Sequence, residues 1–150
     1  MEKTVRSCLT LFALMMVAPA PASAEVTRVL LPNGQKVTLD AVYRKNNEIR
    51  VFGSASSIVF PTEVMRAAVV RMAELASARD MPRFAVVKIS DCGQLKMYGS
   101  AVNSQCRLLG QMLREGEAAR PEGKREVTIF RTADVVGGRL MPEADAANGF

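Results

Sequence analysis

One amphipathic segment, residues 62–80, limits the possible folds most strongly, because it is the clearest helical pattern in a chain of short β-rich runs. Pro61 or Thr62 suits the first turn of a helix, and Met81 followed by Pro82 ends it. Apolar residues recur at three- and four-residue steps and form one stripe: Met65, Ala68, Val69, Met72, Leu75 and Ala76. A methionine-bearing stripe could line an adaptable binding groove, but a single helix beside strands has to bury that face. We therefore expect the stripe to form one layer of the core.

Short β-rich runs precede this helix. Residues 26–31 are aliphatic and β-branched, and the turn signal Pro-Asn-Gly follows them at 32–34. Residues 35–43 alternate between apolar and polar side chains, the period of a half-buried strand. A third short strand is expected at 49–52, and the small polar residues at 54–57 read as a loop. The first half of the domain is therefore a hairpin followed by a third strand.

The part of the chain after the helix is expected to return to β structure. Residues 83–90 form an apolar-rich strand, 91–93 a turn, and 94–98 an antiparallel return. Residues 105–113 fit either a helix or a strand, because periodicity cannot settle short apolar runs. We favour a strand there, since it lets Cys106 meet Cys92 within one sheet. A further strand is expected at 126–130.

These elements predict a single α+β domain over residues 25–141, followed by a disordered tail at 142–150. Its antiparallel sheet of about five to six strands packs one face against the 62–80 helix, and residues 115–124 form an exposed loop. The expected sheet core is Val29, Leu31, Val37, Leu39, Val51, Phe84, Val86, Ile89, Leu108, Val127 and Ile129.

The first 24 residues resemble a cleaved signal peptide. They combine a basic start, an apolar run at 9–18 and small residues at 22–24, the positions that a signal peptidase reads. The apolar run is too short to cross a bilayer, which needs roughly 20 residues. The alternative is a retained anchor or an amphipathic N-terminus. With cleavage, the mature chain begins at Glu25 and is a periplasmic or secreted, soluble protein.

Two of the three cysteines remain after such cleavage, Cys92 and Cys106. An even pair in an exported protein predicts a structural disulfide bond. A redox-active pair would more often be spaced as Cys-x-x-Cys. Cys8 precedes the apolar run, so it is not placed for lipid attachment.

Basic residues form two groups that could bind an anion. Arg44, Lys45 and Arg50 flank one predicted turn, and the second group lies around the long loop: Arg114, Arg120, Lys124 and Arg125. Loss of Glu2, Lys3 and Arg6 with the leader lowers the formal net charge from +5 to +4, an ordinary value for a small domain. Because exported proteins meet few nucleic acids, an anionic surface is the expected partner if these groups are functional. The alternative is that both groups are solvated loops.

Catalytic and metal-binding patterns are scarce. The chain has no histidine, which removes the commonest general base and metal ligand, and we predict no cofactor and no metal. A hydrolase would have to use carboxylates, for which Glu48, Glu63, Asp80 and Asp91 are nominal candidates, or Lys88 with a serine.

The segment RAAVVRMAELASARDMPRFAVVKIS, residues 66–90, is similar to a unit of small exported bacterial envelope proteins of uncharacterised function. In those proteins a helix of the form RAAELALE precedes a glycine and an aromatic-bearing strand, whereas Asp-Met-Pro replaces the glycine here. The resemblance implies bacterial export and assigns no site.

Taken together, these patterns favour a non-enzymatic binding or scaffolding protein of the cell envelope, with another envelope protein as a possible partner. The alternatives are a binder of anionic lipid or glycan through the basic loop, and a small carboxylate-dependent hydrolase. The oligomeric state stays open.

Overall fold

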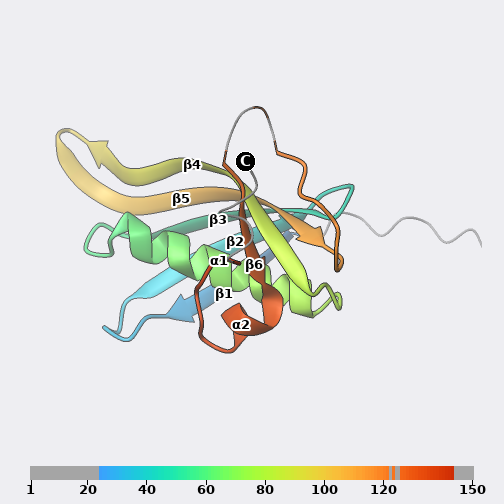
Figure 1. Ribbon diagram of the computed structural model, residues 1–150. Helices are drawn as coiled ribbons and strands as arrows, with labels where there is room; N and C mark the ends of the chain where they lie inside the picture. The colour runs from blue at the N-terminus through green and yellow to red at the C-terminus, as the bar shows by residue number, and fades with distance from the viewer. Residues whose placement is uncertain (1–23, 122, 124–125, 144–150) are drawn as a thin grey trace, which may run out of the picture.

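The computed structural model describes residues 24–121, 123 and 126–143. In chain order it contains β1 (Ala24–Leu30), β2 (Lys36–Tyr43), β3 (Glu48–Ser56), α1 (Pro61–Ser77), β4 (Arg83–Met97), β5 (Ser100–Leu113), β6 (Thr128–Arg131) and α2 (Thr132–Val136). The strands form one antiparallel sheet in the order β1-β2-β3-β5-β4-β6 (Figure 1). The predicted α+β class, with one main helix, is confirmed.

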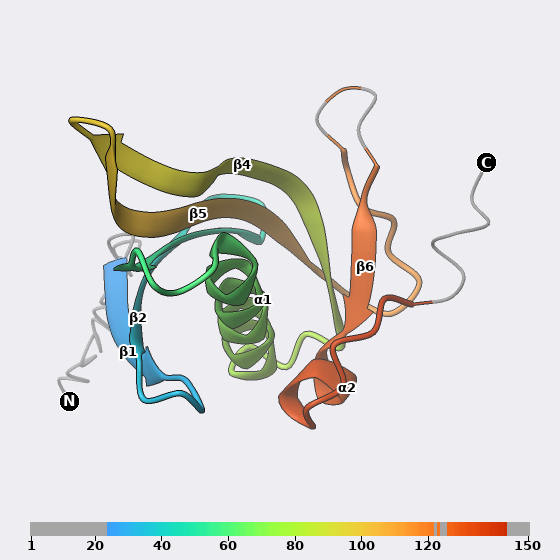
Figure 2. The same ribbon diagram turned by 90° about the vertical axis from the view of Figure 1, so that its left-hand side faces the viewer.

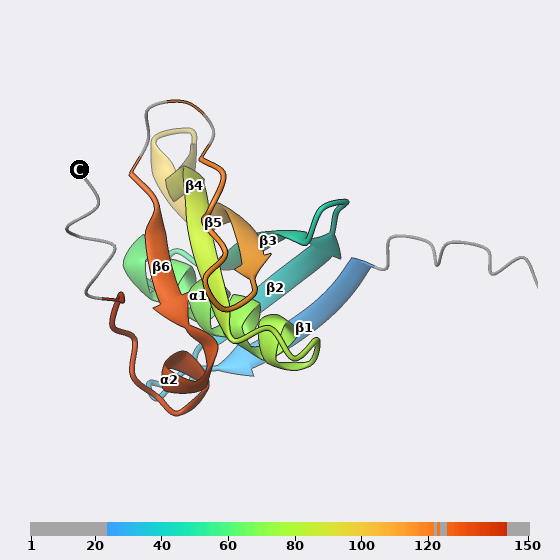
Figure 3. The same ribbon diagram turned by 45° about the vertical axis from the view of Figure 1, so that its right-hand side comes forward.

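The sheet arches over α1 (Figure 2). β1 and β2 descend on one side of the helix, β3, β5 and β4 pass above it, and β6 with α2 lies on the other side, as Figure 3 also shows. We call the surface that α1 covers the helix face and the opposite surface the open face. Alternate residues of each strand therefore belong to different environments.

The main core lies between the helix face and α1. Of the predicted sheet core, Val37, Leu39, Val51, Phe84, Val86 and Leu108 are buried there, and Val29 and Leu31 are half-buried against them. The helix stripe packs as expected, with Met65 half-buried and its other members buried. Two glycines permit the close approach. A Cβ at Gly53 would lie 2.7 Å from Val64 Cγ1, and one at Gly110 would lie 2.7 Å from Met72 Sδ.

Three predicted core residues lie elsewhere. Ile89 is 49% exposed, because β6 pairs with β4 only as far as Val86 and leaves the rest of β4 at the sheet edge. Val127 and Ile129 are half-buried in a second, smaller cluster on the open face, whose buried members are Ala85, Val87, Leu109 and Leu113. Ile129 lies opposite Ala85 in register, so its side chain faces the same way as that of Ala85.

Two strands are longer than the sequence predicted. β3 continues through the expected loop at 54–57 as far as Ser56, since β5 supplies pairing partners up to Asn103. β4 runs through the expected turn at 91–93, where a register shift between Ser90 and Gly93 takes up the irregularity. The chain reverses instead at Tyr98 and Gly99, whose φ values of 51° and 80° suit a tight hairpin turn. The preference for a strand at 105–113 is confirmed by β5.

The ends of the elements also differ from expectation. α1 ends at Ser77, and Asp80 lies in the following turn with a φ of 55°. Pro142 and Glu143, which the sequence placed in the tail, belong to the fold: Pro142 pairs with Phe130, and the Glu143 N–H donates to the Ile129 carbonyl at 2.7 Å. Residues 144–150, and the leader up to residue 23, lie outside the described residues. Ala24, the last residue of the predicted leader, is the first residue of β1.

Candidate functional site

The structure places Cys92 and Cys106 at disulfide distance across β4 and β5. Cys106 is fully buried on the helix face next to Leu108, whereas Cys92 is exposed at the register shift of β4. The turn predicted at 91–93 is absent, and the pairing of β4 with β5 in one long hairpin brings the two cysteines together. The pair lies at the base of the outer part of this hairpin, residues 92–106, which we call the arm.

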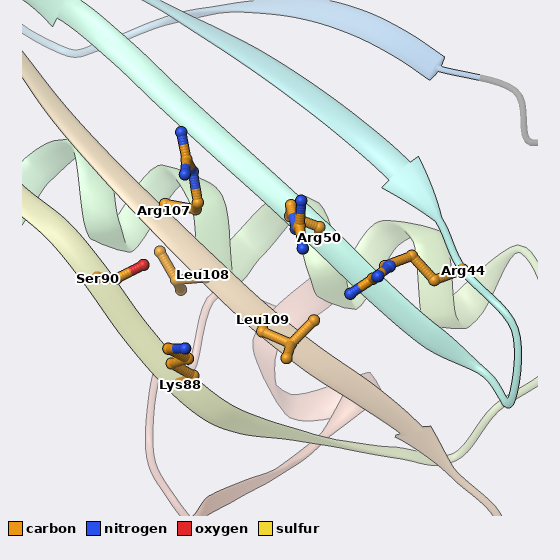
Figure 4. Close-up of a pocket in the computed structure, with 7 residues that line it drawn as sticks. All are labelled: Arg44, Arg50, Lys88, Ser90, Arg107, Leu108 and Leu109. Carbon is orange, nitrogen blue, oxygen red and sulfur yellow. The ribbon is translucent and has the colours of Figure 1, made fainter. Parts of the chain in front are cut away.

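A basic hollow lies on the open face, around Leu109 of β5. Its volume is about 160 Å³, and its lining consists of Arg44, Arg50, Lys88, Ser90, Arg107, Leu108 and Leu109 (Figure 4). That volume suits a small anion better than an organic ligand, since pockets for such ligands usually enclose roughly 300–1,000 Å³. No carboxylate belongs to the lining.

Strand register explains why these residues gather. Arg50 of β3 and Lys88 of β4 both lie opposite Leu109, so the three side chains form one row on the open face. Arg107 lies two residues from Leu109 on β5 and opposite Ser90, which forms the next row. Arg44 comes from the turn after β2, and its side chain extends towards Arg50 in Figure 4. Four cationic side chains from three strands and a turn thus surround one apolar floor.

Arg44 and Arg50 give the hollow an excess of positive charge. Arg44 and Arg50 have no ion-pair partner among the described residues. Arg107 Nη1 lies 3.3 Å from Asp91 Oδ2, and its guanidinium carbon lies 5.4 Å from the centroid of the Phe52 ring. Both members of this ion pair are about half exposed, so water weakens it.

The basic loop predicted from the sequence is not part of the hollow. Arg114 and Arg120 are exposed, while Lys124 and Arg125 lie outside the described residues. Buried Gln111 anchors the loop by donating to the Arg120 carbonyl at 2.8 Å and accepting from the Arg120 N–H at 2.7 Å. The loop therefore covers the neighbouring part of the open face, over Leu109 and Leu113.

The candidate carboxylates have different surroundings. Glu63 Oε2 accepts the Phe60 N–H at 3.0 Å and so caps α1, and Asp91 pairs with Arg107. The side chains of Glu48 and Asp80 have no hydrogen-bond or ion-pair partner among the described residues. Within the described ranges, no group of three or more acidic or cysteine side chains could hold a metal ion.

Sequence reasoning grouped Arg44 with Arg50 and named Lys88 only as a hydrolase candidate, and it did not place Lys88 or Arg107 beside the two arginines. Arg107 and Lys88 lie far from them in the chain, and only the register of β5 between β3 and β4 brings them together. Alternation of side chains in residues 105–113 was the signal that could have placed Arg107 on the open face, but the sequence of this segment fits a helix as well as a strand.

Comparison with protein-family models, curated proteins and solved structures finds no match for this chain. Among the described residues, no helix combines the length and apolar character needed to cross a membrane.

Proposed function

We propose that this chain is a non-enzymatic binding protein of the bacterial cell envelope, and that the open-face hollow binds a phosphate-bearing anion. The observation that carries the proposal is the gathering of Arg44, Arg50, Lys88 and Arg107 around one hollow without a lining carboxylate. Holding like charges together is unfavourable, and an anion between them removes that repulsion.

Phosphate suits this lining better than a simple halide. Each guanidinium presents a planar fork of N–H donors that matches two oxygens of a phosphate, and a hydroxyl such as that of Ser90 can donate to a further oxygen. The floor formed by Leu109 excludes water from one side, which strengthens the charge interactions. Export, an envelope location and a protein partner remain part of the proposal and rest on the leader and the resemblance alone.

Calorimetric titration with inorganic pyrophosphate tests the proposal. Arg50→Gln should weaken binding about tenfold, the usual effect of losing one charge-assisted hydrogen bond. Arg66→Gln is the matched control, because Arg66 is an exposed arginine on α1, on the opposite side of the sheet. Equal affinities for the two variants, or no binding by the wild type, would reject the hollow as the site.

One observation favours a second candidate, the serine hydrolase that uses Lys88. Lys88 and Ser90 are two residues apart on β4, and both line the hollow. Hydrolysis of p-nitrophenyl acetate that disappears in Ser90→Ala would support this activity. Pyrophosphate binding by a wild type that shows no hydrolysis would support the binding protein.

A further inference from the structure

The β4–β5 arm exposes apolar side chains that no other part of the described chain covers. Leu95, Met97 and Val102 are each about half exposed, and Tyr98 at the tip is fully exposed. Exposed apolar groups on a projecting element are typical of contact surfaces. The arm therefore offers a contact surface to a partner with apolar character.

The charge of the arm narrows the choice of occupant. Residues 92–106 contain one charged side chain, Lys96, and no aspartate or glutamate. Tyrosine is enriched where hydrocarbon meets water, because its ring is apolar and its hydroxyl is polar. An apolar tip with a single positive charge fits the surface of an anionic bilayer.

The arm and the basic hollow project from the same side of the molecule. Leu95 lies opposite Asn103, and Asn103 shares the open face of β5 with Arg107. Figures 1 and 2 show the tip of the arm displaced away from α1, on the side of the open face. One flat surface placed against this side can meet both the arm and the hollow.

The base of the arm is held in place. The Cys92–Cys106 pair joins its two strands, Gln94 Nε2 donates to the Ser57 carbonyl at 2.9 Å, and the Ser104 hydroxyl donates to the Val59 carbonyl. An arm fixed in this way loses little conformational freedom when its tip is buried.

We propose that the anion in the hollow is the phosphate of an anionic phospholipid, and that the arm inserts Met97 and Tyr98 into the same membrane surface. This inference rests on the proposed function, because it names the source of the phosphate. Insertion is shallow, in the headgroup region, and the chain stays on the surface. The basic side chains attract the anionic headgroups while the tip adds apolar burial.

A tryptophan reporter at the tip tests the inference, because the chain contains no native tryptophan. Tyr98→Trp should show a blue-shifted emission with phosphatidylcholine vesicles that contain roughly 30% of the anionic lipid phosphatidylglycerol. It should show no shift with vesicles of pure phosphatidylcholine. Phe60→Trp is the control, because Phe60 is 69% exposed on the loop that leads into α1. Its emission should stay unchanged with both vesicles.

Sedimentation with the same vesicles separates the two proposals. The double variant Met97→Ser, Tyr98→Ser should bind anionic vesicles about tenfold more weakly and keep its affinity for pyrophosphate. Arg50→Gln should weaken both. The membrane inference is overturned, and the proposed function stands, if the wild type binds pyrophosphate but not the vesicles. The same follows if the double variant binds the vesicles as tightly as the wild type does. If the wild type does not bind pyrophosphate, both the proposed function and the membrane inference are rejected.

Discussion

Arg107 and Asp91 form an ion pair across β5 and β4, with 3.3 Å between Arg107 Nη1 and Asp91 Oδ2. Asp91 is therefore a competitor for any anion that Arg107 holds. Asp91→Asn should tighten pyrophosphate binding by about two- to fivefold, since an exposed ion pair is worth up to about 1 kcal/mol. Asp134→Asn on α2 removes the same charge away from the hollow and should leave the affinity unchanged in the same titration. Weaker binding by Asp91→Asn would argue against Arg107 as a ligand.

The Cys92–Cys106 pair is expected to stabilise the fold. Removing the crosslink should cost about 2–4 kcal/mol of the free energy of unfolding, because a closed loop of about 15 residues regains its conformational freedom in the unfolded chain. Cys92→Ser isolates this effect, since Cys92 is exposed and Cys106 is buried. Urea unfolding followed by circular dichroism should give the same midpoint for this variant and the reduced wild type. Two thiols that react with an alkylating agent in the native, unreduced protein would disprove the bond.

Gly53 is required where α1 crosses β3. Gly53→Ala should destabilise the protein by about 1–3 kcal/mol, because the new Cβ would lie 2.7 Å from Val64 Cγ1, so that the Val64 side chain or the helix must shift. Gly93→Ala on β4 meets nothing within 4 Å and should be neutral or slightly stabilising. Thermal unfolding of the two variants side by side measures the difference, and equal midpoints would contradict the packing of α1.

Glu143 is expected to fasten the end of the described chain to the sheet. Its carboxylate pairs with Arg83 at 3.0 Å and with Arg131 at 2.9 Å, and both Glu143 and Arg83 are mostly buried. Glu143→Ala should cost about 1–3 kcal/mol of stability, because Arg83 then loses its charged partner. Glu115 also contacts Arg131, at 3.6 Å, but is 65% exposed. Glu115→Ala should cost under about 0.5 kcal/mol. Urea unfolding of both variants checks this, and a Glu115→Ala variant that is less stable than Glu143→Ala would contradict it.

The sequence was sufficient for the elements whose patterns are local. The 62–80 stripe predicted α1, and alternation in 35–43 predicted β2, because each reports its own burial with the correct period. The class of the fold followed from one helix among several strands.

Features that depend on pairing partners could not be predicted in this way. Asp91, Cys92 and Gly93 have the composition of a turn, but β5 pairs with both flanks and turns the segment into an irregularity within β4. Ile129 was placed in the main core, yet its register with Ala85 directs it to the open face. The basic hollow is missed for the same reason, since Arg50 and Arg107 meet only through the order β3-β5-β4.

Backbone amide chemical shifts during a pyrophosphate titration test the central claim most directly. We predict saturable shifts at Arg50, Ser90 and Leu109, which surround the hollow, and little change in the basic loop at 115–121. The shifts should shrink when the salt concentration rises, because screening shortens the reach of charges to about 8 Å at 0.15 M. Shifts confined to the loop, or no saturable shifts at all, would contradict the assignment of the open-face hollow as an anion-binding site.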